Sequence, residues 1–180
     1  QRGTISGLSA FNGDTLRLIA PMVRTLDHKT KTLSGNTAVN FSAGVSYTGT
    51  GQKLGHADVH QLVSVTEGSG GANVTEHFNL DTGQRDTHYD AGRITLKPTS
   101  NYTAAVALEV TYKYFDHSSA GDFFTVDSYA AIDYEDIPKH GDLELRSCVD
   151  FRSRTGNAGA VFTGTGAVTA FCPTRYSQFE

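Results

Sequence analysis

Two long stretches of the chain alternate between apolar and polar residues, at positions 39–47 and, with Ala107 as an exception, 106–114. The apolar positions are Val39, Phe41, Ala43, Val45 and Tyr47 in the first stretch, and Val106, Leu108, Val110, Tyr112 and Tyr114 in the second. A period of two places such side chains on one face of a β-strand. Each stretch therefore predicts a strand with one buried face and one exposed face.

Shorter runs predict further strands at Leu16–Ile19, Val59–Val65, Val74–Phe78, Arg93–Lys97 and Phe123–Asp127. Turn-forming sequences such as LSGN, EGSGG and KPTSN separate these runs, and no long window has the apolar spacing of a helix. Strands that follow one another without intervening helices are typical of antiparallel all-β folds. We therefore expect an antiparallel β-sandwich, Ig-like or related, with long ordered loops and little helix.

The length of 180 residues suits one well-buried domain. We expect a single β-rich domain over residues 1–155, followed by a Gly/Ala/Thr-rich extension or interface segment over residues 156–180. Residues 128–142 are polar and contain Pro138, which predicts an ordered surface loop with room for one helical turn. Because residue 1 is Gln and the C-terminal residues have no stop signature, we expect the chain to be part of a longer polypeptide.

The net charge of -4 and the lack of a Lys/Arg run argue against nucleic acid and anionic membrane as partners. No window approaches the roughly 18 apolar residues that a membrane-spanning helix needs. The two cysteines, Cys148 and Cys172, fit no zinc-binding spacing. They are either two reduced thiols or a disulfide that closes a loop of about 25 residues, and the sequence leaves both readings open.

One pair among the seven histidines has a metal-binding spacing, His56 and His60. A separation of four suits zinc on a helix, but the Glu of the HExxH motif is missing and the following residues predict a strand. Four strand residues span about 13 Å, which is too far for two imidazoles to share one zinc ion. The pair therefore predicts no metal site.

Three aspartates, Asp81, Asp86 and Asp90, have oxygen ligands of the kind that calcium prefers. Gly83 and Arg85, however, occupy two of the ligand positions that an EF-hand loop would need. The sequence also lacks a GxSxG motif and a phosphate-binding glycine motif. We expect no catalytic residue, no metal and no cofactor, although two catalytic carboxylates brought together only by folding would leave no such signature.

Charged residues occur within apolar sequence in two segments, the first with Asp81, Arg85, Asp86 and Asp90, the second with Arg146, Asp150 and Arg152. The first segment also holds Gly83, which can take a positive φ where the chain turns between strands. Arginine pairs with carboxylates through two parallel hydrogen bonds. We predict that these eight residues form a structural network of turn and ion pairs, in which Arg85 or Arg152 bridges the two segments.

Three stretches carry a recurring pattern: VTEHFNLDTGQRDTHYDAGRITLKP, VTYKYFDHSSAGDFFTVDSY and YEDIPKHGDLELRSCVDFRSR. Their order and spacing resemble a domain of unknown function found in large virion structural proteins of tailed bacteriophages, over about residues 57–154. The matching residues are Thr75, Phe78, Leu80, Asp81, Gly83, Gln84, Arg85, Asp86, Tyr89, Asp90, Tyr114, Phe115, Gly121–Val126, Ser128, Tyr129, Ile137, Pro138, Leu145, Arg146, Asp150, Phe151, Arg152 and Arg154.

Three positions depart from that pattern: Thr82 replaces Asn, Cys148 follows Ser147 where Asp is usual, and Ser153 replaces Pro. The lost Asp removes one partner for Arg85, so the predicted pairing rests on Asp150. The resemblance implies a non-enzymatic virion structural protein of the tail, baseplate or fibre apparatus. Its partners would be other virion proteins and copies of itself, as a trimer or hexamer by analogy with tails.

Two other classes of function fit the sequence. Exposed Tyr and Asp side chains on a loop such as 130–142 would suit a module that binds or depolymerises carbohydrate at a host surface. Sequons at Asn40, Asn73 and Asn101 would suit an extracellular Ig-like adhesion module, although the chain has no Trp at the position that such domains usually fill.

Overall fold

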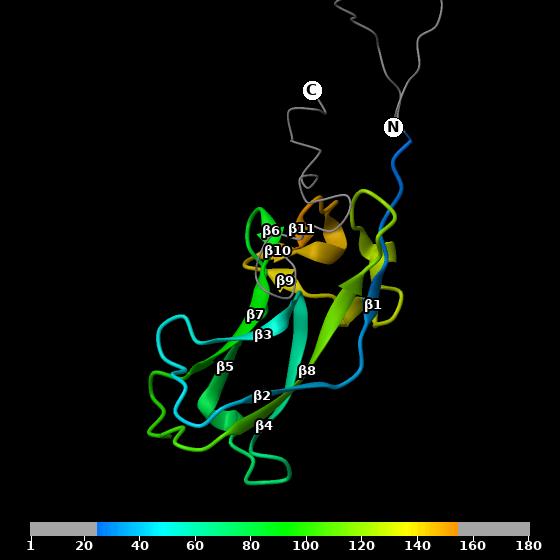
Figure 1. Cartoon of the computed structure of the whole chain (residues 1–180). Coiled ribbons are helices and arrows are strands. Elements are labelled where there is room, and N and C mark those ends of the chain that lie inside the picture. The colour runs from blue at the N-terminus through cyan, green and yellow to red at the C-terminus, as the bar shows by residue number, and fades with distance from the viewer. Residues whose placement is uncertain (1–24, 155–180) are drawn as a thin grey trace, which may run out of the picture.

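The computed structural model describes residues 25–154, and these form an all-β structure of antiparallel sheets with a few turns of 3-10 helix (Figure 1). The predicted all-β class is therefore confirmed. Within the described range, no helix is long and apolar enough to cross a membrane. The predicted strand Leu16–Ile19, the segment 156–180 and Cys172 lie outside the described residues.

Strand β8 (Leu108–His117) is the centre of the larger sheet. Strand β4 (Val59–Glu67) pairs along one edge of β8. Strands β1 (Lys31–Leu33) and β2 (Thr37–Phe41) pair one after the other along the opposite edge. All of these pairs are antiparallel, so β8 is hydrogen-bonded on both sides for most of its length.

A second sheet has β7 (Ala91–Leu96) in its middle, between β3 (Gln52–Ala57) and β5 (Phe78–Asp81). Both pairs in this sheet are antiparallel. Strands β3 and β4 belong to different sheets and are separated by Asp58, which has a φ of 54°. A positive φ is uncommon outside glycine, and here it turns the chain from one sheet into the other.

Short elements cover one end of the two sheets. Strand β6 (His88–Tyr89) pairs in parallel with β11 (Ser153–Arg154), and β9 (Lys139–His140) pairs with β10 (Leu143–Glu144). The 3-10 turns are Thr75–His77, Val126–Tyr129, Tyr134–Asp136 and Leu145–Ser147. Residues 128–142 thus contain parts of two such turns, as well as β9.

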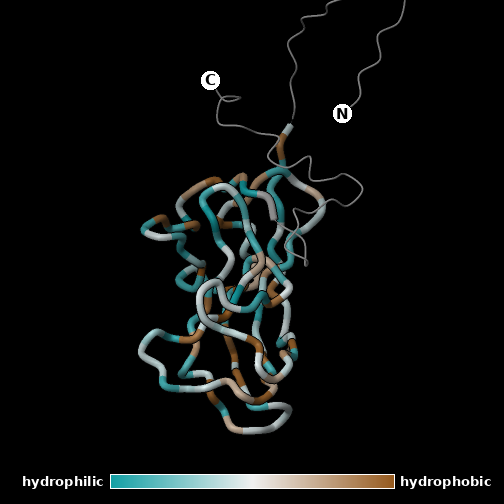
Figure 2. The backbone as a smooth tube through the Cα atoms, turned by 60° about the vertical axis from the view of Figure 1, so that its left-hand side comes forward, coloured by the Kyte–Doolittle hydropathy of each residue, from teal (hydrophilic) through white to brown (hydrophobic). Residues whose placement is uncertain are grey.

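Both sheets contribute to the largest hydrophobic cluster, with Leu54, Phe78 and Ile94 from one and Val65 and Val110 from the other. Figure 2 shows hydrophobic residues, in brown, interspersed with hydrophilic ones, in teal, along the described chain. Two smaller clusters lie under the short elements, one around Phe115, Tyr129, Ile137 and Leu145, the other around Ala57, Tyr89 and Phe124. The second of these surrounds the polar site described below.

Neither of the two long alternating stretches forms a strand with the predicted bounds: the first contributes to β2 only up to Phe41, and the second forms β8, which extends to His117. The strand at 39–47 ends at Phe41 because the chain turns through Gly44, which has a φ of 78°. In β8 the buried face changes after Tyr112, and Phe115 and His117 are the next buried residues. Tyr114 still packs against the main cluster, whereas Phe115 is buried on the opposite face because Tyr129, Ile137 and Leu145 pack against it there.

Two of the shorter strand predictions are wrong. Val74–Phe78 is mostly a 3-10 turn, in which the Thr75 hydroxyl, and not a backbone carbonyl, accepts the Val65 amide at 2.7 Å. Phe123–Asp127 makes only isolated bridges before the next 3-10 turn begins, where Ser128 Oγ accepts the amide of Thr125. The predictions of Val59–Val65 and Arg93–Lys97 are confirmed by β4 and β7.

Candidate functional site

The turn after β5 is built on Asp81 and Gly83. Asp81 Oδ1 accepts the amide of Gly83 at 2.9 Å, and the Gly83 carbonyl accepts the amide of Asp90 at 2.6 Å. Gly83 has a φ of 84°, and a Cβ atom built on it would lie 2.0 Å from the Asp90 carbonyl oxygen. The positive φ that the sequence predicted for Gly83 is confirmed, and the close approach excludes any side chain there.

Replacing Gly83 by Ala is expected to lower the melting temperature, because the variant adds a backbone clash to an unfavourable φ. Strain at such a residue costs about 1–3 kcal/mol before the clash is counted. Gly44→Ala is the matched control, since Gly44 has a similar φ of 78° but no neighbouring atom within 4 Å of its Cβ position. Equal losses of melting temperature in the two variants would show that the contact with Asp90 contributes nothing.

Arg85 pairs within its own turn. Its guanidinium donates two hydrogen bonds to Asp81, at 2.9 and 2.7 Å, and lies 3.9 Å from an Asp90 oxygen. Burial by itself raises the pKa of Asp81, but the hydrogen bonds from Arg85 and the Gly83 amide, together with the charges of Arg85 and Arg93, leave the pKa lowered. The Arg85 side chain therefore stabilises the turn and does not form the predicted bridge to the second segment.

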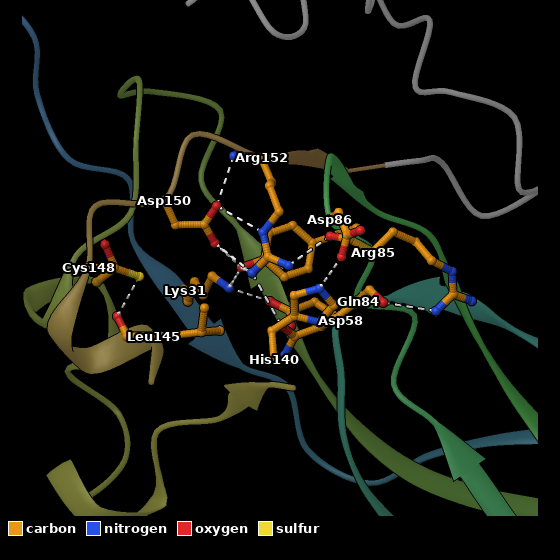
Figure 3. Close-up of polar contacts among 12 residues, drawn as sticks. Lys31, Asp58, Gln84, Arg85, Asp86, His140, Leu145, Cys148, Asp150 and Arg152 are labelled. Carbon is orange, nitrogen blue, oxygen red and sulfur yellow. Dashed lines mark hydrogen bonds and ion pairs between the residues drawn. The ribbon is translucent and has the colours of Figure 1, made fainter. Parts of the chain in front are cut away.

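Arg152 spans the two segments instead, as Figure 3 shows. It donates to both Asp150 carboxylate oxygens, from Nε at 3.0 Å and from Nη2 at 2.9 Å. Across the chain it donates to the Arg85 carbonyl at 2.9 Å and to Gln84 Oε1 at 3.2 Å. A planar guanidinium can make these contacts together because its donors point in fixed, divergent directions. Arg152, with Asp150, is thus the bridge between the turn and the second segment.

Three of the other predicted network residues lie at the periphery. The Asp86 side chain is 97% exposed and pairs with His140 Nε2 at 2.9 Å. Arg146 pairs with Glu144 at 2.9 Å, away from the turn. Asp90 lies 3.9 Å from Arg85 and 3.8 Å from Arg93, both at the edge of ion-pair range. The structure therefore brings together only part of the predicted set.

Four residues that the sequence did not single out complete the site: Lys31, Asp58, Tyr89 and His117. Lys31 Nζ donates to Asp58 Oδ2 at 2.6 Å, and His117 Nε2 lies 2.7 Å from the same oxygen. The side chains of Lys31, Asp58 and His117 are only 0%, 2% and 3% exposed. Lys31 and His117 lie close together because they are cross-strand partners in β1 and β8.

The Tyr89 hydroxyl joins this group to the bridge. It accepts hydrogen bonds from Lys31 Nζ and Arg152 Nη2, each at 2.9 Å, and donates one to Asp150 Oδ2. A phenolic oxygen has one donor and two acceptor positions, so Tyr89 is fully hydrogen-bonded. We call Lys31, Asp58, Tyr89, His117, Asp150 and Arg152 the buried network.

Aromatic rings enclose the cations of the buried network. Lys31 Nζ lies 4.1 Å from the ring centre of Tyr89, 4.6 Å from that of Phe124 and 4.7 Å from that of Tyr129. The Arg152 guanidinium lies 4.3 Å from the Tyr89 ring centre. Ring faces carry negative electrostatic potential, so they replace part of the hydration that the cations lose on burial.

Burial and ion pairing oppose each other in the network. Burial lowers the pKa of Lys31, against the attraction of Asp58. Burial alone would raise the pKa of Asp58, but Lys31 and His117 hold it at about 2. In the same way, Arg152 and Tyr89 overcome burial to lower the pKa of Asp150. Two carboxylates and two cations thus balance one another in the interior when His117 is neutral.

The buried network is arranged to stabilise the fold, and its polar groups are not accessible to a ligand in solution. Every polar group described above in the buried network has a partner inside the protein, and the side chains are nearly inaccessible. Over residues 25–154, no three His, Cys, Asp or Glu side chains are grouped in a way that could hold a metal ion. Cys148 Sγ lies 3.6 Å from the Leu145 carbonyl, and because Cys172 lies outside the described residues, both sequence readings of the two cysteines stay open.

Sequence signals for the missed residues exist but are weak. Asp58 is a single acidic residue between Ala57 and Val59 in an otherwise strand-like run, a pattern that would place it inside. Lys31 and His117 have no such local signal, because their positions depend on the pairing of β1 with β8.

Comparison of the chain with protein-family models, with curated proteins and with solved structures found no match.

Proposed function

We propose that this chain is a non-enzymatic structural component of a tailed bacteriophage particle, in the tail, baseplate or fibre apparatus, and that it acts through assembly interfaces. The main support is where the residues that resemble the phage family lie in the structure. Among them, the polar residues Gln84, Tyr89, Asp150 and Arg152 are bonded to one another in the interior. A recurring pattern placed in this way specifies an architecture, whereas catalytic or binding patterns place functional groups where a ligand can reach them.

The proposed architecture is a β-sandwich. Its support is the main hydrophobic cluster, to which both sheets contribute buried side chains. The buried network lies at one end of these sheets and connects the strand pair β1–β8 with the turn after β5 and the segment 150–152. Hydrogen bonds and ion pairs between distant segments would help the domain to resist deformation by mechanical force on the virion.

The surface near this end of the sheets offers apolar contact area. Within residues 25–154, four of the six large hydrophobic residues that are exposed fall between positions 126 and 149: Val126, Tyr134, Leu143 and Val149. Single exposed apolar residues are ordinary, but their concentration in one segment is typical of interaction surfaces. We propose that this segment contacts copies of the same chain or neighbouring particle proteins, with three or six copies by analogy with tails.

Charged substitutions test the proposed interface. Leu143→Lys and Val149→Lys, at positions 52% and 55% exposed, are expected to shift the assembled protein toward monomer in sedimentation experiments without lowering its melting temperature. Val63→Lys and Val106→Lys, also at exposed positions but elsewhere on the chain, serve as controls. If all four variants assemble like the unaltered chain, residues 126–149 are not the interface.

The function itself is tested on particles. Mass spectrometry of purified virions made by the genome that encodes this chain should detect it, and labelling in electron micrographs should place it on the tail. The main alternative is a carbohydrate-binding or depolymerising module with an exposed Tyr134 at its surface. A free monomer that binds or hydrolyses polysaccharide, and is missing from the particles, would replace the structural proposal with that one.

A further inference from the structure

Lys31 and Asp58 are a lysine and an aspartate whose reactive atoms touch in the interior. Nζ lies 2.6 Å from Oδ2, and the two side chains are 0% and 2% exposed. The carboxyl carbon is bonded directly to that oxygen, so it lies one bond beyond the contact. Groups held at such separations react as if at very high concentration, because the entropic cost of bringing them together is met by folding.

Burial makes the Lys31 amine easier to deprotonate than a lysine in water. Nζ lies in a site closed to solvent, and this burial lowers its pKa, against the attraction of Asp58 and the ring faces for the charged form. A desolvated lysine is a nucleophile because it carries a free lone pair once its proton is lost. The Lys31 charge helps to hold the pKa of Asp58 low, so transfer of the Nζ proton to Oδ2 also removes that restraint.

Neighbouring groups are placed to assist a reaction between the two. His117 Nε2 lies 2.7 Å from Asp58 Oδ2 and can stabilise charge that collects on this oxygen. The Tyr89 hydroxyl lies 2.9 Å from Lys31 Nζ and donates to Asp150, so the two can take up a proton from the amine and return it. These contacts place a charge-stabilising group at Oδ2 and a proton acceptor at Nζ, which a condensation requires.

We propose that Lys31 and Asp58 join spontaneously in the folded protein to form an intramolecular isopeptide bond. The amine attacks the carboxyl carbon, a bond forms between Nζ and that carbon, and the bond from the carbon to Oδ2 breaks. Oδ2 leaves as water, with one proton from the carboxyl group and one from the amine. The step is a condensation without oxidation or reduction and needs no co-reactant. The buried site then protects the amide from hydrolysis.

The bond would close the chain between β1 and the β3–β4 corner. A covalent link between segments that are distant in sequence restricts the unfolded chain and so stabilises the fold, as a disulfide does. It would do so without dependence on redox conditions. The inference rests on the buried network alone and is independent of the proposed virion role.

The intact mass of the purified 180-residue protein tests the inference. We expect a mass lower than that of the sequence by one water molecule, and a branched peptide joining the segments of Lys31 and Asp58 after protease digestion. Peptide mapping is needed because dehydration of any aspartate to a succinimide would change the mass equally. Lys31→Met and Asp58→Ala should each restore the full mass.

Lys139 and Glu144 provide an internal control. Their charged atoms are 2.7 Å apart, close to the 2.6 Å of Lys31 and Asp58, but the Lys139 side chain is 60% exposed to water, so this pair should remain unlinked. The decisive measurement uses the unaltered chain, after a cooperative melting transition has shown it to be folded. A full sequence mass, with Lys31 and Asp58 recovered in separate linear peptides, would overturn the inference whatever the variants do.

Discussion

Replacing Arg152 by Met is expected to lower the free energy of unfolding by about 3–5 kcal/mol, the usual cost of removing one partner from a buried ion pair. The variant leaves the Asp150 carboxylate in the interior without its bidentate donor and removes the contacts to Gln84 and the Arg85 carbonyl. Chemical denaturation measures the loss. Met is a suitable replacement because it keeps much of the apolar volume of the arginine stem.

Arg146→Met is the control for this variant. Arg146 also forms an ion pair, with Glu144 at 2.9 Å, but at the surface, where solvent screens the charges. We expect little change in its melting temperature, and an intermediate loss for Arg85→Met, whose pair with Asp81 is partly exposed. If Arg152→Met and Arg146→Met lose the same small amount of stability, burial of an ion pair does not determine how much the pair contributes to stability.

Asp58→Ala is expected to be about as destabilising as Arg152→Met, with a loss of about 3–5 kcal/mol. It leaves the Lys31 amine in a site that is closed to water and removes the acceptor of the His117 hydrogen bond. The double variant Lys31→Met, Asp58→Ala should be more stable than Asp58→Ala alone, since apolar side chains of similar size often replace a buried ion pair well.

The same variant should show a characteristic dependence on pH. Burial lowers the pKa of Lys31 in the folded state from its ordinary value of 10.5, and Asp58, which opposes this shift, is missing in the variant. The unfolded state then binds more protons than the folded state, so stability rises with pH until the pH passes about 10.5. Denaturation of Asp58→Ala at a series of alkaline pH values measures this rise, which Lys31→Met should abolish.

Those parts of the fold that depend on local alternation were predictable from sequence. β7 was found because Ile94 and Leu96 alternate with polar residues, and β4 because Val59–Val65 is a short run rich in valine. The burial of Phe115 on the other face of β8 was not predictable, because it depends on Tyr129, Ile137 and Leu145, which come from segments distant in sequence. Phe123–Asp127 has strand-like residues but lacks a continuous partner strand, and an unpaired strand has no reason to persist.

The candidate site was predictable to the extent that its residues lie in charged, apolar-flanked segments. Asp150 and Arg152 stand out in this way, and arginine chemistry indicated that one of the arginines would bridge. The choice between Arg85 and Arg152 depended on a competing local partner: Asp81, four residues from Arg85, takes that guanidinium. Lys31 was missed because surface exposure is the ordinary expectation for lysine, and only the pairing of β1 with β8 places it inside.

A double-mutant cycle between Arg152 and Tyr89 tests the central claim most directly, namely that the buried network joins the turn segment to the segment 150–152. The variants are Arg152→Met, Tyr89→Phe and the pair together, each measured by chemical denaturation. Arg152 Nη2 donates to the Tyr89 hydroxyl at 2.9 Å, so the account predicts a coupling energy of about 0.5–3 kcal/mol. Losses that simply add, with no coupling between the two positions, would contradict it.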